Sequence, residues 1–469
     1  MTEPHYVPAA TIRARFASAM SGMYRAEVPK YGVLLDMVRD INDKLLQKDP
    51  TLRSQLEASD NLQRLGDERH GAIRLGSAAE LNTMRRLFAV MGMYPVGYYD
   101  LSVAGIPVHS TAFRPVSAAE LRDNPFRIFT SLLRLDLITD QALRERAAGL
   151  LARRQIFSAR TLELIDTHES QNGLDAQQAD EFVREALHTF RWHEQATVNA
   201  ATYQQFLASH RLIADIVCFK GPHINHLTPR TLDIDAVQQQ MPARGLDAKA
   251  IVEGPPARRH PILLRQTSFK ALDEPIEFID VDGTQQGSHT ARFGEIEQRG
   301  CALTPRGRRL YDRLLDRVRQ RVSDPAIAAD QYLGELEAEF AAFPDDLDVM
   351  RREGLAYVTF GANPNKTGNL HSLDEMVSGG VLSIHPITYE DFLPISAAGI
   401  FQSNLDQRET QAFARSPNQQ TFERDLGSSV IDEFELYAGI QRRSLADALH
   451  TLGLDEDRRS GLLAQLGEA

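Results

Sequence analysis

Hydrophobic positions near the start of the chain recur at the spacing of amphipathic helices. Residues 9–48 predict two such helices, and they are separated at Pro29 because proline disrupts the interior of a helix. A third helix is predicted from Ser77 to about Met91. Ser77 suits an N-cap, and Glu80 three positions later completes a capping-box pattern. The first part of the chain is therefore expected to be mainly helical.

Shorter apolar runs, rich in aromatic and β-branched residues, predict strands. Residues 93–101 form the first run. The runs 213–219, 262–269 and 288–298 follow in the middle of the chain, and residues 381–405 return to strand and loop character. We expect these segments to build a β-rich core.

Long stretches rich in alanine, leucine, arginine, glutamate and glutamine predict further helices. The block 116–215 has few glycines and prolines and is expected to contain several packed helices. Another helix is expected from Pro305 to about Val322. Together these elements predict an α+β fold. We expect a single catalytic unit over residues 1–469, with a helical insert at 116–215 and a mostly helical C-terminal tail at 406–469.

Composition and charge narrow the classes of protein. The net charge of −12 disfavours an electrostatic association with nucleic acid or with an anionic membrane. No apolar run approaches the ~20 residues of a membrane span, and the first residues lack a signal-peptide pattern. With only Cys218 and Cys301, a disulfide framework, a cysteine-rich zinc site and a cysteine-ligated iron–sulfur cluster are excluded. We expect a cytoplasmic protein.

Three distant segments carry the candidate chemistry. They are ERHGAIR (68–74), KGPHINHLTP (220–229) and ARFGEIEQRG (291–300). Two imidazoles and one carboxylate are the ligands with which non-haem iron enzymes hold Fe(II) on one face, leaving positions for substrate and dioxygen. Fourteen histidines allow many chance combinations, so these residue types alone do not select one set.

Side-chain geometry limits which of these residues can face a common point. His70 and Arg74 are four residues apart and share a face whether their segment is helical or extended. Glu295 and Glu297 share a face only on a strand, so either can supply the carboxylate. Simpler structural readings compete: Arg74 as a surface cation, and Glu297 as the partner of a neighbouring arginine.

The two histidines of the second segment are three residues apart. His223 and His226 share a face on a helix but point to opposite faces on a strand. Pro222 and Pro229 bracket the pair and leave room for little more than one helical turn. Unless that turn forms, we expect only one of them to be a ligand, and we favour His226.

Seven long and unusual runs show a family resemblance. They are ERHGAIR (68–74), FAVMGMYPVGYYDL (88–101), VHSTAFR (108–114), FKGPHINHLTPRTLDID (219–235), VEGPPARRHPILLRQTSFKAL (252–272), HTARFGEIEQRG (289–300) and YEDFLPISAAGIFQSNL (389–405). They resemble the bacterial 2-oxoadipate dioxygenase/decarboxylase family over nearly the whole chain, most weakly at 320–380 and at the C-terminal end. The resemblance implies a vicinal-oxygen-chelate-like fold, in which a partly closed, β-barrel-like sheet encloses an iron and is surrounded by helices.

The resemblance also implies roles for individual residues. The implied metal ligands are His70, His226 and Glu295, with Glu297 as the alternative carboxylate. The implied substrate contacts are His70, Arg74, His226, Ile395 through its main chain, and Ser396. Arg74 is the implied catalytic residue, because its guanidinium can bind the distal carboxylate of the substrate through paired hydrogen bonds. Further candidate pocket residues are Arg265, Gln266, Lys270, His223, Arg292 and Gln402.

The implied activity is an Fe(II)-dependent reaction of 2-oxoadipate with O2 that gives 2-hydroxyglutarate and CO2, in lysine breakdown. The partners are thus a small dicarboxylic 2-oxo acid and O2, and Fe(II) is the expected cofactor. Two neutral imidazoles and one carboxylate leave the iron with residual positive charge, which favours binding of the anionic 2-oxo acid. The preferred chain length, the product stereochemistry and the oligomeric state stay open.

Two other functions are compatible with the same residues. The site could hold Zn(II), Ni(II) or Mn(II) in an isomerase, lyase or hydrolase of the glyoxalase type, because affinity order does not favour Fe(II). The chain could also be a metabolite-binding or metal-stabilised scaffold protein. The position of Arg74, four residues from His70, favours an enzyme.

Overall fold

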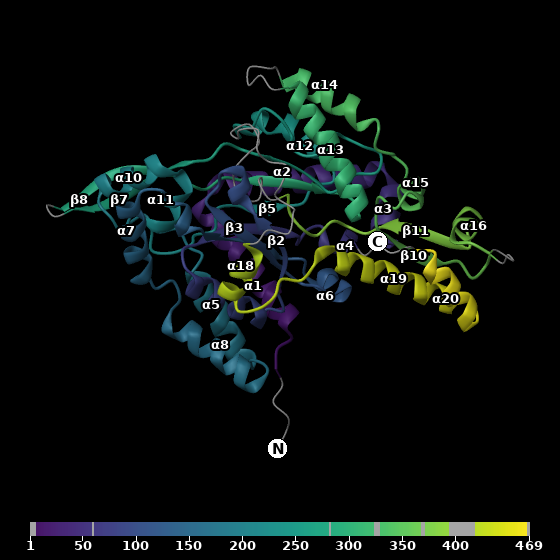
Figure 1. Cartoon of the computed structure of the whole chain (residues 1–469), viewed down its shortest axis with the longest axis horizontal. Helices are drawn as coiled ribbons and strands as arrows, with labels where there is room; N and C mark the ends of the chain where they lie inside the picture. Colours follow the sequence, from purple (N-terminus) through teal and green to yellow (C-terminus); the bar gives the residue numbers. More distant parts are fainter. Residues whose placement is uncertain are drawn as a thin grey trace.

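The chain is described by a computed structural model in which helices surround several small sheets (Figure 1). The described residues are 6–58, 61–280, 283–322, 329–366, 371–393 and 418–466. Their strands form one five-stranded sheet and three two-stranded sheets, so the fold is α+β, as predicted. Over these residues the sheets do not close into a single barrel.

The five-stranded sheet has the strand order β2–β3–β4–β1–β5. Its strands are β1 Arg69–Leu75, β2 Tyr94–Asp100, β3 Val108–Arg114, β4 Arg127–Leu133 and β5 Leu227–Pro229. β1 runs parallel to β4 and antiparallel to β5. It therefore lies inside the sheet, where His70 pairs with Arg127 on one side and with Thr228 on the other.

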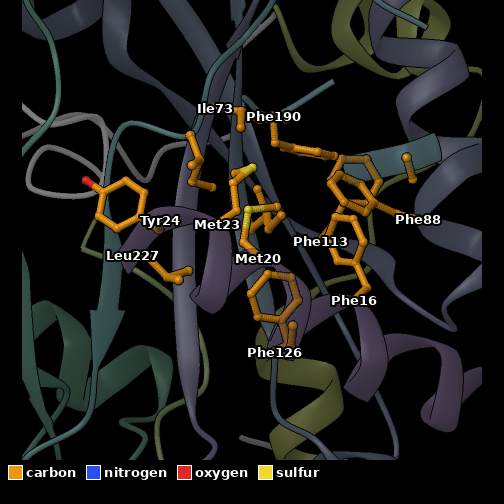
Figure 2. Close-up of a cluster of buried hydrophobic side chains, with 14 of the residues drawn as sticks. Phe16, Met20, Met23, Tyr24, Ile73, Phe88, Phe113, Phe126, Phe190 and Leu227 are labelled. Carbon is orange, nitrogen blue, oxygen red and sulfur yellow. The ribbon is translucent and has the colours of Figure 1, made fainter. Parts of the chain in front are cut away.

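Helix α1 packs against one face of this sheet (Figure 2). This face is surrounded by α1 Ala9–Glu27, α2 Pro29–Lys48, α5 Ala78–Val90, α8 Ala159–Gln171 and α9 Ala176–His188. Phe16, Met20 and Tyr24 of α1 recur at helical spacing and enter one buried cluster with Ile73 of β1 and Phe113 of β3. The apolar stripe of α1 thus anchors this helix to the strand that carries His70.

The opposite face of the sheet packs against a second group of helices. These are α7 Gln141–Ala152, α10 Ala200–Ser209 and α11 Arg211–Val217. Ala72 of β1 and Phe129 of β4 lie in this cluster. Since side chains alternate along a strand, His70 and Arg74 lie on the same face of β1 as Ala72.

The small sheets extend the fold around the central one. They pair β6 Leu264–Ser268 with β9 Glu295–Arg299, β7 Asp273–Asp280 with β8 Gly283–Thr290, and β10 Val358–Ala362 with β11 Leu382–Pro386. An isolated bridge between Arg230 and Glu297 links β9 to the chain just after β5. Thr231 N also donates to Glu297 O at 2.8 Å. These contacts place β9 beside the central sheet.

A separate apolar core lies around β10 and β11. Its helices are α13 Pro305–Arg321, α14 Ala329–Phe340, α15 Leu347–Arg352, α16 Leu373–Ser378, α19 Glu433–Thr451 and α20 Glu456–Ala464. The remaining helices are α3 Pro50–Ala58, α4 Asn61–Arg64, α6 Ala118–Asp123, α12 Ile234–Gln240 and α18 Gln419–Leu426. None of the helices in the described ranges combines the length and the apolarity needed to cross a membrane.

One predicted element is wrong and a second is incomplete, while many others are confirmed. The N-cap at Ser77 is confirmed, because its Oγ accepts from Glu80 N at 3.3 Å. The strand expected at 213–219 is instead helix α11, a short apolar run whose periodicity suits either structure. The block 116–215, expected to be helical, also contains strand β4. This strand is buried along its whole length, so it lacks the alternating pattern that marks a half-exposed strand.

Candidate metal centre

His70 lies on β1 and is completely buried. Its Nε2 atom is 3.0 Å from Oε1 of Glu295, and its Nδ1 atom is 3.1 Å from Oε2 of Glu297. The imidazole thus lies between two carboxylates, one at each ring nitrogen. The two glutamates, equivalent in the strand pattern, therefore occupy different positions in the site.

Glu297 lies on the Nδ1 side of the His70 ring, and its carboxylate contacts two arginines. Its Oε1 atom accepts from Arg299 Nε at 2.7 Å and is 3.6 Å from Arg127 Nη1. Burial acts to raise the pKa of Glu297, but Arg299, His70 and Arg127 outweigh it and lower this pKa to about 2. A carboxylate at the far nitrogen of a metal-binding imidazole fixes its tautomer and orientation. Glu297 is placed for that supporting role.

Glu295, the first residue of β9, faces the other nitrogen of His70. Its Oε1 atom accepts from Thr228 Oγ1 and from Gln266 Nε2, each at 3.0 Å. Its Oε2 atom has no hydrogen-bond partner among the described residues. Strands β5 and β6 therefore orient one carboxylate oxygen and leave the other available to a ligand.

His226 immediately precedes β5 and is also completely buried. Its Nε2 atom is 3.7 Å from Oε1 of Glu295, and neither ring nitrogen hydrogen-bonds to any part of the chain that the structure describes. Burial lowers the pKa of His226 to about 4, so the ring is neutral at pH 7. A buried polar group without hydrogen bonds is costly, and a bound cation would remove that cost.

The three side chains fit a single divalent metal ion. One ligand atom each from His70, His226 and Glu295 can be chosen so that all lie within 4.8 Å of one another. Over the described ranges, this is the one cluster of histidine, cysteine or acidic residues with such spacing.

Two glycines allow the ligand-bearing segments to approach closely. A Cβ atom on Gly71, next to His70, would lie 2.5 Å from Ile224 Cδ1. A Cβ atom on Gly294, next to Glu295, would lie 2.0 Å from Phe269 Cε1. Both distances are shorter than any van der Waals contact. Both glycines are visible in the sequence next to candidate ligands, and they could have indicated that these segments pack closely.

Arg74 is buried on the same strand as His70, and its guanidinium contacts a carboxylate. Its Nη1 atom is 2.5 Å from Asp215 Oδ2. The other oxygen of Asp215 lies 2.9 Å from His289 Nε2 and 3.3 Å from His223 Nε2. His223 therefore belongs to the surroundings of Arg74 and not to the metal cluster, which agrees with the preference for His226.

Asp215 and Thr228 were missed as functional candidates. Asp215 lies on α11, where the sequence pattern predicted a strand, and Thr228 is an uncharged residue among the charged candidates. Of the further pocket candidates, Gln266 contacts Glu295. Arg265 instead pairs with Asp235 at 2.6 Å.

The remaining candidate pocket residues lie elsewhere. Lys270 pairs with Asp247 at 3.0 Å on the surface. Arg292 pairs with Glu274 and with Glu27. The predicted substrate contacts Ile395 and Ser396, and the candidate Gln402, lie outside the described residues.

An α+β chain with two buried imidazoles and one buried carboxylate around a common point is a candidate mononuclear metalloprotein. Comparison with known proteins identifies its family. The model of the 2-oxoadipate dioxygenase/decarboxylase family matches residues 16–404. The chain belongs to this family.

Relatives cover almost the whole chain. The 2-oxoadipate dioxygenase/decarboxylase of Pseudomonas putida is 56% identical over 96% of this chain and 98% of its own length. The protein of the same name from Escherichia coli is 52% identical over 93% of this chain and 98% of its own. The crystal structure of the hydroxyglutarate synthase from Pseudomonas putida in complex with 2-oxoadipate is 54% identical, with a TM-score of 0.88, and the match covers 96% of this chain and 99% of that one.

Proposed function

We propose that this protein is an Fe(II)-dependent 2-oxoadipate dioxygenase/decarboxylase, which converts 2-oxoadipate and O2 into 2-hydroxyglutarate and CO2. The observation that carries the proposal is the buried cluster of His70, His226 and Glu295, in which neither nitrogen of His226 has a hydrogen-bond partner among the described residues. The names of the relatives and the 2-oxoadipate complex of one of them support the choice of substrate. By the same resemblance, we place the reaction in lysine breakdown.

The atoms of the proposed reaction balance. C1 of 2-oxoadipate leaves as CO2, and C2 becomes the new carboxylate with one atom of O2. The other oxygen atom enters the neighbouring C–H bond as the hydroxyl group of 2-hydroxyglutarate. The substrate supplies all the electrons that reduce O2, so no second reductant is needed.

His70, His226 and Glu295 would hold the Fe(II) from one side. When bound, the metal would supply a positive, redox-active centre with open positions for the reaction of a 2-oxo acid with dioxygen. Glu297 keeps the His70 ring oriented through Nδ1, while Thr228 and Gln266 orient the carboxylate of Glu295. The chain thus contributes a rigid, buried set of ligands.

Arg74 would bind the distal carboxylate of the substrate and act as the catalytic residue of the pocket. Its guanidinium contacts Asp215 and presents a planar set of N–H donors whose geometry suits a carboxylate. We also retain, as parts of the proposal, a main-chain contact from Ile395 with Ser396 beside it, and substrate contacts from His70 and His226. The vicinal-oxygen-chelate-like, partly closed sheet around the metal is likewise proposed.

Turnover measurements test the proposal. Protein loaded anaerobically with Fe(II) is mixed with 2-oxoadipate and O2, and we expect O2 uptake, CO2 and 2-hydroxyglutarate in equal amounts. Protein loaded with Zn(II) should consume no O2. Turnover with Zn(II) but without O2 uptake would identify the isomerase, lyase or hydrolase alternative. No product with any divalent metal would leave the metabolite-binding alternative.

A further inference from the structure

The three proposed metal ligands come from distant segments that meet at one backbone junction. Ala72 O, two residues after the histidine of β1, accepts from Asn225 N at 3.0 Å. Asn225 directly precedes His226, and its carbonyl accepts from Phe293 N at 3.2 Å. Phe293 in turn lies two residues before Glu295. Every proposed ligand is therefore within two residues of this junction.

A tyrosine hydroxyl from helix α1 reaches the same junction. Tyr24 Oη donates to Phe293 O at 2.7 Å and lies 3.1 Å from Asn225 O. Figure 2 shows the hydroxyl of Tyr24 pointing away from the labelled apolar cluster, while its ring stays beside the cluster. The side chain is completely buried, and burial raises its pKa well above the ordinary value, so the hydroxyl stays protonated as a donor.

We propose that Tyr24 is a positioning residue for the metal centre, because its hydroxyl holds the His226 and Glu295 segments at a fixed separation. The helix that carries it is anchored independently. Phe16, two turns earlier on α1, packs its ring edge-on against Phe126 and Phe190 at centroid distances of 5.9 and 5.4 Å. The hydroxyl therefore projects from a firmly anchored helix. Since His226 and Glu295 lie one and two residues from the carbonyls that it contacts, the distance between these carbonyls also sets the distance between the two ligands.

This inference rests on the proposed metal site and predicts an effect on metal binding. Ligands must be held within about 0.5 Å of their binding geometry, and supporting hydrogen bonds provide that restraint. A hydroxyl that only satisfied two buried carbonyls would change stability alone. Removal of a positioning hydroxyl would also change the metal affinity and the geometry around the metal, even in protein that is fully folded.

Tyr31 on α2 provides a matched control. Its ring packs edge-on against Tyr24 at 5.0 Å between centroids, and it is equally buried. Its hydroxyl faces the side chains of Ser21 and Arg69 and not the carbonyls of the junction. Tyr31→Phe thus removes the same atom from the same aromatic pair without touching the junction.

The experiment compares the full-length wild type, Tyr24→Phe and Tyr31→Phe. Fe(II) affinity is measured by anaerobic equilibrium dialysis, and the visible absorption spectrum of bound Co(II) reports the metal geometry. We expect Tyr24→Phe to weaken Fe(II) binding by about 10-fold or more, the scale of lost supporting contacts, and to change the Co(II) spectrum. Tyr31→Phe should match the wild type in both measurements. Circular dichroism checks folding, and sucrose added equally to all three samples keeps a destabilised variant folded.

The outcomes separate this inference from the proposed function. Wild-type affinity and an unchanged Co(II) spectrum in Tyr24→Phe would overturn the positioning role and leave the metal site intact. Equal weakening in both variants would also overturn it, because the effect would then belong to general packing. Failure of the wild type itself to bind Fe(II) or Co(II) would overturn both proposals.

Discussion

At the scale of single residues, His226 links the physical chemistry of burial to the proposed chemistry of the site. Its ring is neutral at pH 7, because burial lowers its pKa to about 4. Both ring nitrogens lack hydrogen-bond partners among the described residues, while the nearby His223 is close to Asp215 at 3.3 Å. The two histidines of one short segment therefore differ in whether the protein itself satisfies them.

This difference predicts which histidine supports metal-dependent stability. Fe(II) that binds only the folded state stabilises it by about 2.7 kcal/mol when its concentration is 100 times Kd. His226→Ala should abolish the increase in Tm on adding Fe(II), and His223→Ala should keep it. Anaerobic thermal unfolding with and without Fe(II) measures both. A full metal-dependent increase in His226→Ala would contradict its assignment as a ligand.

Arg74 is the residue that should decide between dicarboxylic and monocarboxylic substrates. Loss of a buried arginine–carboxylate pair costs about 2–5 kcal/mol. Arg74→Ala should therefore lower kcat/KM for 2-oxoadipate by the corresponding factor, about tenfold for each 1.4 kcal/mol. For 2-oxohexanoate, in which a methyl group replaces the distal carboxylate, the loss should be much smaller. Steady-state kinetics with both acids measures the difference.

Arg265 provides a control for that measurement. It was also a candidate pocket residue, but it pairs with Asp235, whose side chain is 45% exposed. Arg265→Ala should therefore affect both substrates little. Equal losses for the two acids in Arg74→Ala would remove its proposed role in binding the distal carboxylate.

At the scale of elements, the site depends on how closely β9 and its preceding loop pack on β6. Gly294 makes this possible, since a Cβ atom there would lie 2.0 Å from the ring of Phe269. The residue that follows is Glu295, so any shift of the loop also moves the carboxylate. Close backbone packing and ligand geometry are therefore coupled in this element.

Gly294→Ala should be destabilising and should weaken metal binding. Overpacking a tight interior costs about 1–3 kcal/mol, and relief of the clash requires movement of Phe269 or of the loop. The same change at Gly334, an exposed position of α14, should stabilise the protein by about 1 kcal/mol through helix propensity, because a Cβ atom there would have no neighbour within 4 Å among the described residues. Urea unfolding and Fe(II) dialysis measure both variants. Unchanged stability and Fe(II) affinity in Gly294→Ala would show that the close approach of Gly294 to Phe269 constrains neither the fold nor the position of Glu295.

Elements differed in how well the sequence pattern predicted them. Helices α1, α2 and α5 were predictable, because their apolar stripes and the cap at Ser77 are local signals. Helix α11 and strand β4 were not, because short or fully buried segments lack a distinctive period. Asp215 was missed for the same reason: its contact with Arg74 comes from the packing of α11 against the sheet.

At the scale of the whole molecule, a buried ionic cluster joins distant parts of the chain behind the metal centre. Its buried members are Arg64, Glu68, Arg127, Arg230, Glu297, Arg299 and Glu390. Glu390 follows β11 and pairs with Arg64 of α4 at 2.8 Å and with Arg127 of β4. Burial acts to raise the pKa of Glu390, but Arg64 and Arg127 outweigh it and lower this pKa to about 2.

Glu390→Gln should therefore destabilise the protein in a pH-dependent manner. Removing one partner of a buried ion pair costs about 3–5 kcal/mol. A lowered folded-state pKa contributes stability above the unfolded value near ~4.3, and this contribution is lost as the pH falls toward 2. The difference between wild type and Glu390→Gln in urea unfolding free energy should be largest at pH 7 and should shrink below about pH 4.3.

An exposed ion pair provides the comparison for this prediction. Glu163 pairs with Arg160 at 2.8 Å on the surface of α8, so Glu163→Gln should change the unfolding free energy little at any pH. A difference for Glu390→Gln that stayed constant from pH 7 to pH 3 would show that its charge does not support the fold.

The sequence by itself determined the family, the α+β class, the two histidines proposed as ligands, and the pair Glu295 and Glu297 from which the carboxylate comes. Imidazole and carboxylate chemistry belongs to individual side chains, and the family's runs of residues are continuous in the chain. The same information identified Arg74, four positions from His70 on whichever regular structure formed.

Only the tertiary structure decided the position and the contacts of each of these groups. It placed Glu295 at Nε2 of His70 and Glu297 at Nδ1, and it paired His223 with Asp215. These choices depend on the register of β9 beside β5 and on the packing of α11. Both join segments far apart in the chain, and no local pattern encodes the distance between them.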